Sequence, residues 1–278
     1  RALVVEKERF GGQNTITEQG VNYPGVAHTS GTQLTETMRQ QAQSFGAEFL
    51  LAEVTGLDLA GDVKTVRTSR GDLSCFGVLW ATGAHPRMVG FQGEEQFRGR
   101  GVAYCATCDG MLYRGKTVVV VGGGNSAAED ALFLSRVCKK VYLVHRGAVL
   151  TASKSYWTAL QKAENVEFIW NSRVVELLYG SVVTGVVLEG VESGNRSELA
   201  CDGVFISVGR APATELFRRE QLLDKSGYIV ADESTRTNLP GVFAAGDVRT
   251  KALRQVVTAV SDGAVAVHYA EEYLAENR

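Results

Sequence analysis

The stretch KTVVVVGGGNSAAED, residues 116–130, sets a run of valines directly against three glycines. An apolar β-branched run that ends in glycine is typical of a parallel strand covered on both faces. The segment 125–138 that follows predicts a helix, and the apolar residues of 140–145 predict a second strand. Residues 114–148 are therefore expected to form a βαβ unit.

The glycines of this unit match a dinucleotide-binding fingerprint, Gly122-x-Gly124-x-x-Ala127. The first glycine permits the tight turn, the second lets the backbone approach a pyrophosphate, and the small third residue lets helix and strand pack closely. The amino end of the helix attracts the phosphate charge. The next strand ends at His145-Arg146 without an acidic residue, a pattern that favours a 2′-phosphate over a free ribose hydroxyl.

The rest of the chain alternates strand and helix patterns, so the fold class is α/β. The further predicted elements are strands in 1–6, 76–84 and 241–247, helices in 31–47 and 257–277, an antiparallel hairpin in 63–80 and a small antiparallel sheet in 174–209. In the first helix Leu34, Met38 and Phe45 are expected to share one face.

The composition limits the classes of function. The chain has 278 residues, is 45% hydrophobic and carries a net charge of −2 with an isoelectric point near 6.2. A nucleic-acid or membrane-surface binder usually carries a basic excess, so neither class is expected. The sequence contains no run of 18 apolar residues and no secretion signal, which predicts a cytosolic location.

Five cysteines are present, and two of them form the pair Cys105-x-x-Cys108, with Asp109 next to it. A zinc site, a structural disulfide and a redox dithiol are the alternatives. Zinc needs more ligands than the sequence offers nearby, and so short a disulfide loop stabilises little. A dithiol that cycles with a disulfide fits best, and no metal is expected. Asp109 is expected to move protons at the thiols, with a helix N-cap as the alternative role. Cys75, Cys138 and Cys201 are expected to be buried spectators.

Several segments together resemble the low-molecular-weight thioredoxin reductases, flavoproteins of the pyridine-nucleotide disulfide oxidoreductase superfamily. The matching segments are CATCDG at 105–110, VVVVGGGNSAAED at 118–130, GGQNTITEQGVNYPG at 11–25, ATGA at 81–84, SVGRAP at 207–212, LPGVFAAGDV at 239–248 and RQVVTAVSDGAVAV at 254–267. The resemblance covers essentially the whole chain.

The resemblance implies a role for each matching residue. Cys108 would face the flavin, Cys105 would attack the disulfide of thioredoxin, and Asp109 would be the acid–base group. FAD would contact Glu6, Gly11, Gly12, Gln13, Asn22, Thr82, Gly83, Gly246, Asp247, Arg254, Gln255 and Val256. A nicotinamide nucleotide would contact Gly122, Gly124, Asn125, Ser126, Ala127, His145 and Arg146.

The sequence departs from the family pattern in two places. It begins at what resembles the second strand of the flavin domain, so the first strand, glycine turn and helix of that domain are expected to be absent from this chain. NADPH-using members carry His-Arg-Arg-x-x-x-Arg, whereas Gly147 and Thr151 replace two of these arginines here. The donor therefore stays open between NADPH, NADH and a non-nicotinamide donor such as ferredoxin.

The implied architecture is two Rossmann-like domains of three-layer ββα type, each with a small antiparallel sheet. Residues 1–87 and 234–278 would bind FAD, and 88–233 would form an inserted NAD(P)H domain that carries the cysteine pair. The implied enzyme is a homodimeric thioredoxin-disulfide reductase whose domains rotate. The alternatives are a related reductase that serves a peroxidase or a glutaredoxin-like partner, and a flavin-binding redox sensor.

Overall fold

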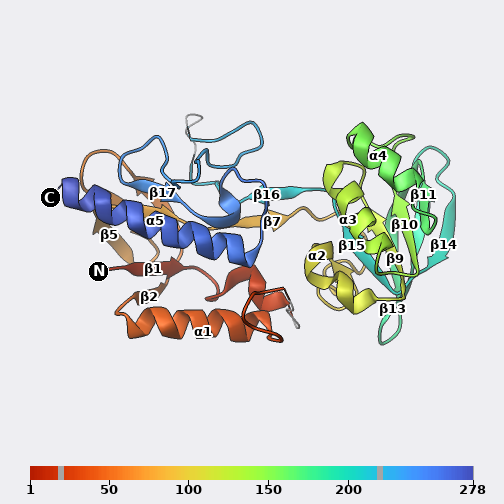
Figure 1. The fold of residues 1–278 in the computed structure, drawn as a ribbon, viewed down its shortest axis with the longest axis horizontal. Coiled ribbons are helices and arrows are strands. Elements are labelled where there is room, and N and C mark those ends of the chain that lie inside the picture. Colours follow the sequence, from red (N-terminus) through yellow and green to blue (C-terminus); the bar gives the residue numbers. More distant parts are fainter. Residues whose placement is uncertain (18–21, 218–221, 278) are drawn as a thin grey trace.

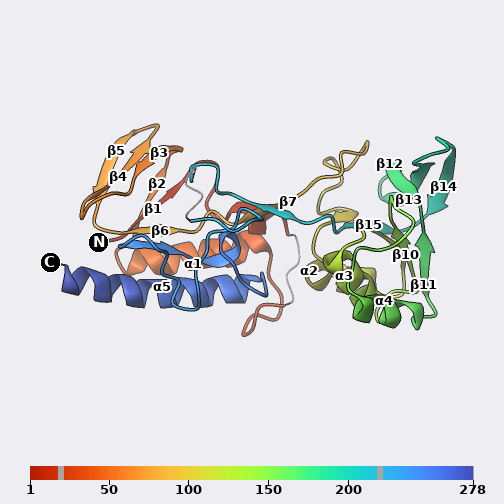
Figure 2. The same ribbon diagram turned by 90° about the horizontal axis from the view of Figure 1, so that it is seen from above.

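The chain folds into two lobes in a computed structural model, which describes residues 1–17, 22–217 and 222–277. Four residues of the segment 11–25 that resembles a flavin-contacting stretch, 18–21, lie outside the described residues. We call residues 1–83 and 213–278 the split lobe, and 87–209 the inserted lobe. Figures 1 and 2 show the lobes side by side, joined by the extended strands β7 (Ala84–Pro86) and β16 (Arg210–Pro212). These two strands pair antiparallel, so both crossings of the chain lie together.

The inserted lobe is built on a parallel sheet. In spatial order its strands are β11 (Val166–Ile169), β10 (Lys140–Val144), β9 (Thr117–Val121), β15 (Gly203–Ile206) and β8 (Val102–Ala103). Helix α3 (Asn125–Ser135) connects β9 to β10 and buries Ala127, Ala131 and Leu134 against the sheet. The predicted βαβ unit is confirmed, because β9 and β10 pair in parallel on either side of this helix in the sequence.

The inserted lobe has a second, antiparallel sheet of β12 (Ser172–Tyr179), β13 (Val183–Gly190) and β14 (Arg196–Ala200). The prediction of one small sheet over 174–209 is wrong at its end, because 203–206 is the buried strand β15 of the parallel sheet. The short helices are α2 (Ala106–Asp109), the 3₁₀ turn η2 (Gly110–Tyr113) and α4 (Lys154–Gln161).

The split lobe contains two separate parallel pairs of strands in the part of the chain that the structure describes. They are β1 (Leu3–Glu6) with β2 (Glu48–Leu51), and β6 (Val78–Trp80) with β17 (Val242–Ala244). A meander of β3 (Val54–Asp58), β4 (Lys64–Thr68) and β5 (Gly71–Cys75) completes the strands. The helices are α1 (Gly31–Ser44) and α5 (Val256–Glu276), with the 3₁₀ turns η1 (Gly12–Ile16) and η3 (Gly246–Val248).

The chain re-enters the split lobe earlier than the predicted boundary at residue 233. Phe217, Leu222 and Ile229 belong to the same buried cluster as Trp80 and Ala244. Trp80 and Phe217 meet edge to face with ring centroids 4.4 Å apart. Burial of these side chains therefore places the crossing at β16, about twenty residues before the boundary that the sequence pattern suggested.

The predicted helix in 31–47 is slightly too long. Ser30 caps α1 by accepting a hydrogen bond from the backbone amide of Gln33, and the helix ends at Ser44. Phe45 lies beyond the last turn and is 91% exposed, so it does not share a buried face with Leu34 and Met38.

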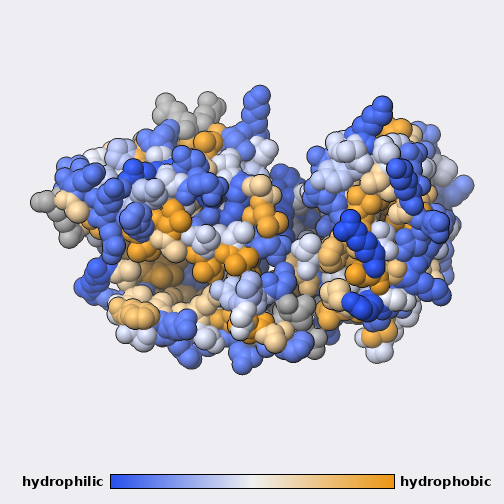
Figure 3. All heavy atoms as spheres, in the orientation of Figure 1, coloured by the Kyte–Doolittle hydropathy of each residue, from blue (hydrophilic) through white to orange (hydrophobic). Residues whose placement is uncertain are grey.

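The split lobe carries an apolar hollow on the face seen in Figure 3, between α5 and α1. Exposed apolar side chains on the bordering elements include Leu3, Val4, Leu51, Val260 and Val267. Among the described residues, no helix is long and apolar enough to cross a membrane.

Candidate active site

Cys105 and Cys108 form a disulfide with an S–S distance of 2.11 Å. Cys105 occupies the N-cap position of α2, and its Sγ accepts a hydrogen bond from the backbone amide of Cys108 at 3.2 Å. The pair therefore spans the single turn of α2, with one sulfur stabilised by an amide of that turn.

Asp109 ends α2 one residue after the disulfide. Burial raises the pKa of its carboxyl group to about 6. The alternative role as a capping residue is not what the structure shows, because Asp109 precedes η2 without a side-chain capping hydrogen bond. A carboxyl group with a pKa near neutrality beside a disulfide is suited to donate and accept protons.

A second carboxyl group near the disulfide was not predicted from the sequence. Asp130 on α3 accepts a hydrogen bond from the Ser207 hydroxyl, and the backbone amide of Ala106 also favours its charged form. Burial is the dominant effect and raises the pKa of Asp130 to about 6. Only packing could reveal this group, because Asp130, Ala106 and Ser207 are far apart in the sequence.

The disulfide helix contacts the split lobe directly. Gln255 donates a hydrogen bond from Nε2 to Thr107 Oγ1 at 3.1 Å, and its Oε1 accepts one from Asn22 Nδ2 at 3.0 Å. A second close approach joins the lobes, since a Cβ on Gly99 would lie 3.2 Å from the backbone oxygen of Ile16. The structure thus brings the cysteine pair together with Asn22 and Gln255, two of the residues expected to contact flavin.

A buried ionic cluster on and near α5 binds the backbone of the Gly246-Asp247 turn. Asp262 on α5 accepts hydrogen bonds from the Gly246 amide at 2.8 Å and from Arg249 at 2.9 and 2.8 Å. Lys251 Nζ adds a contact at 2.7 Å. These partners overcome the effect of burial and lower the pKa of Asp262 to about 2. The sequence analysis missed Arg249 and Asp262, although an acidic residue within the apolar pattern of α5 was a usable signal.

The side chain of Asp247 itself is mostly buried, with 22% of it exposed. Burial raises the pKa of Asp247, and Arg210 and Arg254 oppose that rise. Arg210 approaches at 3.5 Å from the connecting strand β16. Arg254 donates to the Asp247 backbone oxygen at 3.3 Å and lies over the Tyr228 ring. Asp247 is therefore a carboxylate between two guanidinium groups, with Arg210 as its ion-pair partner.

Other predicted flavin contacts lie where the split lobe meets β7. Gln13 donates to the Ala84 backbone oxygen at 3.0 Å, and Thr82 donates to that of Ala213 at 2.6 Å. Gly12 and Gly83 have φ of 50° and 75°, and a Cβ on either would meet no atom within 4 Å.

The remaining predicted flavin contacts are Gly11, Glu6 and Val256. Gly11 has φ of 99° and packs against Thr35, so a side chain there is excluded. Glu6 ends β1, and its carboxylate accepts the Glu8 amide at 2.9 Å. Val256 is the first residue of α5.

The glycine loop between β9 and α3 has the tight geometry of the fingerprint. A Cβ on Gly122 would lie 2.4 Å from the Ser207 backbone oxygen and 2.7 Å from Ala127 Cβ. Gly124 is the N-cap of α3, and a Cβ there would meet only Thr151 Oγ1, at 3.8 Å. The amino end of α3, with the exposed residues Asn125 and Ser126, therefore remains open toward a ligand.

The segment after β10 folds back onto this loop. The His145 ring lies against Gly123, where a Cβ would come within 2.2 Å of it. Thr151 donates to the Gly123 backbone oxygen from its amide at 2.8 Å and from its hydroxyl at 3.1 Å. Arg146 is exposed, so it is the one guanidinium of the family motif that this segment offers to solvent.

The three lone cysteines divide into two groups. Cys138 and Cys201 are buried, and burial raises the pKa of their thiols to about 11 and about 12. Cys75 is only partly buried, so the expectation of a buried spectator is wrong for it.

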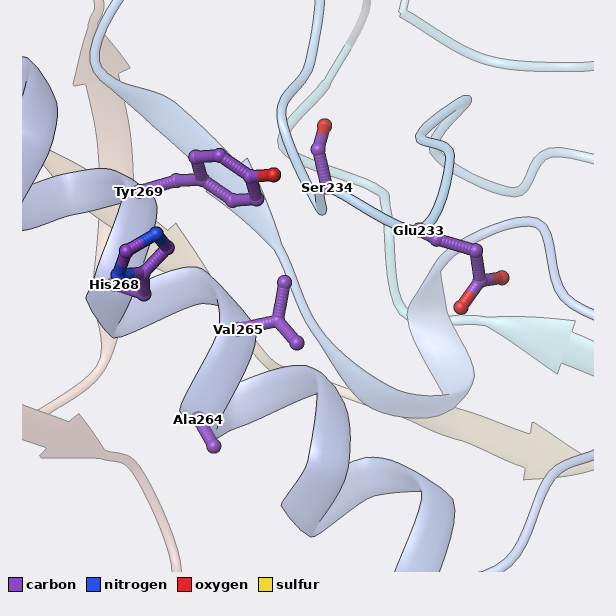
Figure 4. A pocket seen from close by; sticks show the side chains of 6 residues that line it. All are labelled: Glu233, Ser234, Ala264, Val265, His268 and Tyr269. Carbon is purple, nitrogen blue, oxygen red and sulfur yellow. The ribbon is translucent and has the colours of Figure 1, made fainter.

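A hollow of about 490 Å³ lies away from the disulfide, between α5 and the loop before β17. Figure 4 shows Glu233 and Ser234 on one side of it and Val265, His268 and Tyr269 on the other. None of the predicted site residues lines this hollow.

The sequence matches the family model "Pyridine nucleotide-disulphide oxidoreductase" over residues 2–263. The chain belongs to the pyridine nucleotide-disulphide oxidoreductase family. It is 42% identical to a thioredoxin reductase of Treponema pallidum over 99% of this chain and 89% of that protein. The predicted family membership is confirmed.

Two solved structures of thioredoxin reductases fit this member of the family to very different degrees. That of Streptococcus pyogenes has a TM-score of 0.93 at 40% identity, covering 99% of this chain and 90% of the other. That of Lactococcus lactis, described as being in the FR conformation, has a TM-score of 0.65 at 37% identity, covering 99% and 91%. The predicted two-domain dinucleotide-binding fold is confirmed by the first of these matches.

Proposed function

We propose that the chain is a flavoprotein that reduces the disulfide of thioredoxin through FAD and the Cys105–Cys108 pair. One observation carries the proposal: a disulfide next to a near-neutral carboxyl group contacts the residues of the split lobe that resemble a flavin site, through Thr107 and Gln255. The names of the relatives support thioredoxin as the partner. Exposed Met111 and Leu112, just after the disulfide, offer an apolar surface for a protein.

The residues at the lobe boundary fit a flavin. Open space lies over Gly12 and Gly83, and the carboxylate of Asp247 is paired only at 3.5 Å, with Arg210. FAD would be held by the set Glu6, Gly11, Gly12, Gln13, Asn22, Thr82, Gly83, Gly246, Asp247, Arg254, Gln255 and Val256. When bound, flavin chemistry links hydride transfer to reduction of a disulfide.

Two cysteines and one carboxyl group of this protein would carry out the disulfide exchange and the proton transfers. Reduction breaks the Cys105–Cys108 bond with two electrons and two protons and leaves two thiols. Cys105, as a thiolate, would attack one sulfur of the partner's disulfide and release the other as a thiolate. Cys108 would then attack the mixed disulfide, restoring the pair and releasing the reduced partner. Asp109 would supply and remove the protons at these thiols.

The disulfide must be reduced at the flavin and must then react with thioredoxin, and these two steps require the lobes to rotate. In the present orientation α2 contacts the split lobe through Thr107 and Gln255, whereas attack on thioredoxin would need the sulfurs turned toward the partner. The similar identities but different TM-scores of the two solved thioredoxin reductases support two arrangements of the same lobes. Gly83 and Gly209, with φ of 75° and 96°, directly precede the connecting strands β7 and β16, so glycines flank the place where a rotation would occur.

The electron donor is proposed to be a nicotinamide nucleotide held by Gly122, Gly124, Asn125, Ser126, Ala127, His145 and Arg146. Since Thr151 bonds to the glycine loop and Gly147 has no side chain, Arg146 would be left as the one guanidinium for a 2′-phosphate. We therefore expect weak discrimination between NADPH and NADH. A homodimer and a cytosolic location remain proposals from the resemblance and the sequence.

Anaerobic reduction of the FAD-loaded protein tests this function. Flavin absorbance is followed with NADPH, NADH and reduced ferredoxin in parallel, and thioredoxin is then added. We expect both nicotinamide nucleotides to bleach the flavin and thioredoxin to reoxidise it. Bleaching by ferredoxin alone would overturn the proposed donor, and no reoxidation by thioredoxin would overturn the proposed partner.

A further inference from the structure

A chain of hydrogen bonds runs from the split lobe to a sulfur of the disulfide. Asn22 donates to Gln255 Oε1 at 3.0 Å, and Gln255 Nε2 donates to Thr107 Oγ1 at 3.1 Å. The Thr107 oxygen lies 3.4 Å from Cys105 Sγ. Because the Thr107 oxygen already accepts from Gln255, its hydroxyl hydrogen is free to point at the sulfur.

This chain of hydrogen bonds ends at Cys105 Sγ, which becomes a stronger acceptor when the disulfide is reduced. Cys105 Sγ also accepts the Cys108 amide at 3.2 Å, so two donors converge on this atom. A disulfide sulfur is a weak acceptor. Two electrons and one proton convert the pair to one thiol and one thiolate, and a thiolate on Cys105 would accept both bonds strongly, because charge-assisted hydrogen bonds are roughly twice as strong as neutral ones.

We propose that Thr107 is a positioning residue that couples the redox state of Cys105 to the docking of α2 on the split lobe. The same hydroxyl group binds Gln255 across the lobe boundary and holds the reduced sulfur. Hydrogen bonds in such a chain polarise one another, so each strengthens the next. The coupling is reciprocal: reduction tightens docking, and docking favours the thiolate.

This coupling would give the proposed rotation a chemical trigger. With the disulfide formed, one ordinary hydrogen bond at Thr107 holds α2. With Cys105 as a thiolate, the same contact is stronger, so protonation of the thiolate favours release of the reduced pair from the split lobe. The inference rests on the proposed redox role of the pair, but its test needs neither flavin nor thioredoxin.

The surroundings of the pair allow the hydroxyl group to be isolated. The charged and titratable groups nearby are Cys108 and Asp109 on α2, Asp130 on α3 and Arg98, which lies over the Tyr104 ring. None of them is altered by Thr107→Val, which keeps the branched shape and removes the hydroxyl group. Thr107→Ser keeps the hydroxyl group and removes a methyl group. Thr158→Val makes the same change at an exposed position on α4.

The experiment measures how fast iodoacetamide alkylates Cys105 between pH 5 and 10. The full chain is first reduced with dithiothreitol, whose two thiols become a cyclic disulfide, and the reductant is removed without air. Peptide mass spectrometry assigns the label to Cys105. We expect Thr107→Val to slow alkylation at pH 7 about tenfold and to leave the rate at pH 10 unchanged, because only the thiolate fraction falls. Thr107→Ser and Thr158→Val stay within about twofold of the native rate.

The link across the lobes is tested by Gln255→Met, which keeps the side-chain length and removes the donor. We expect slower alkylation at pH 7 that does not add to the effect of Thr107→Val in the double variant. Native rates in Thr107→Val, or equal slowing by Thr107→Ser, would overturn the role of the hydroxyl group. A native rate in Gln255→Met, or additive effects in the double variant, would overturn the coupling to docking.

Discussion

Arg249 and Asp262 form a buried ion pair beneath the Gly246-Asp247 turn, with Nη2 and Oδ1 2.8 Å apart. The side chain of Arg249 is 2% exposed and that of Asp262 7%. Because Asp262 also accepts the Gly246 amide, this pair fixes the backbone that presents Asp247. A residue far from the disulfide thereby shapes the proposed flavin site.

Asp262→Asn should destabilise the protein strongly. It removes the buried carboxylate partner of Arg249 and Lys251 and leaves Arg249 only the exposed Glu233 at 3.7 Å, and breaking a buried pair typically costs about 3–5 kcal/mol. Urea unfolding measures the loss, and FAD binding should weaken with it. Glu271→Gln, on the exposed side of the same helix, serves as the control and should change the free energy of unfolding by less than about 0.5 kcal/mol. Equal effects of the two variants would contradict the role of the ion pair.

Asp109→Asn should stabilise the oxidised protein above neutral pH. The folded-state pKa of Asp109, about 6, is above the ordinary value of 3.8 for an aspartate, so ionisation opposes folding at higher pH. The penalty, on the order of 3 kcal/mol, is absent well below pH 4 and is complete above pH 6. Thermal unfolding at pH 8 and pH 4 checks this: the variant should gain stability at pH 8 and little at pH 4. A gain of the same size at both values would contradict burial as the cause.

Turnover should respond to Asp109→Asn in the opposite direction. The amide cannot transfer a proton to the thiols, so thioredoxin reduction should fall by about 10²–10⁴-fold. Asp202→Asn serves as the control, because the native Asp202 carboxylate accepts the Thr117 amide elsewhere in the inserted lobe. Its turnover should stay near the native value. Wild-type turnover in Asp109→Asn would remove Asp109 from the mechanism.

Cys108→Ser should trap a mixed disulfide with thioredoxin, because Cys105 can attack while no thiol remains to resolve the product. Cys105→Ser should give no such complex. Non-reducing electrophoresis of each variant mixed with oxidised thioredoxin distinguishes them. If only Cys105→Ser forms the complex, the proposed roles of the two cysteines are exchanged.

A cross-link between the lobes should stop turnover without stopping reduction of the flavin. Ile16 and the Gly99 loop approach each other in the present orientation, so cysteines at Ile16 and Arg100 suit a short bis-maleimide. The rate of thioredoxin reduction should fall to background, while dithionite still bleaches the flavin. Each single-cysteine variant treated with the same reagent should keep its turnover. Unchanged turnover in the cross-linked protein would exclude a rotation.

Gly147→Arg should raise the preference for NADPH over NADH. One added charge-assisted hydrogen bond to a 2′-phosphate, about 1.5–3 kcal/mol, corresponds to a roughly 10- to 150-fold change in the ratio of the two dissociation constants. Gly147→Gln provides side-chain length without charge and should leave the ratio near the native value. Isothermal titration with both nucleotides measures it, and no change in Gly147→Arg would place the phosphate elsewhere.

Local patterns predicted the inserted lobe better than the split lobe. The valine run, the glycine loop and α3 are adjacent in sequence, so their contacts follow from strand and helix periodicity. The crossing at β16 was misplaced because 213–233 has no strong pattern, and only the packing of Phe217 and Ile229 on Trp80 assigns it to the split lobe. Phe45 was assigned to a buried face, although the capping of α1 ends the helix before it.

By itself, the sequence determined the α/β class, the βαβ unit and the redox pair, because each depends on residues within a few positions of one another. Tertiary structure alone placed Asp130 at the disulfide, Asp262 under the flavin-site turn and Thr107 against Gln255, a contact between residues 148 positions apart. Burial sets the pKa values of Asp109 and Asp130, and the orientation of the lobes sets what Thr107 can reach. Both depend on the packing of distant segments, which no local pattern encodes.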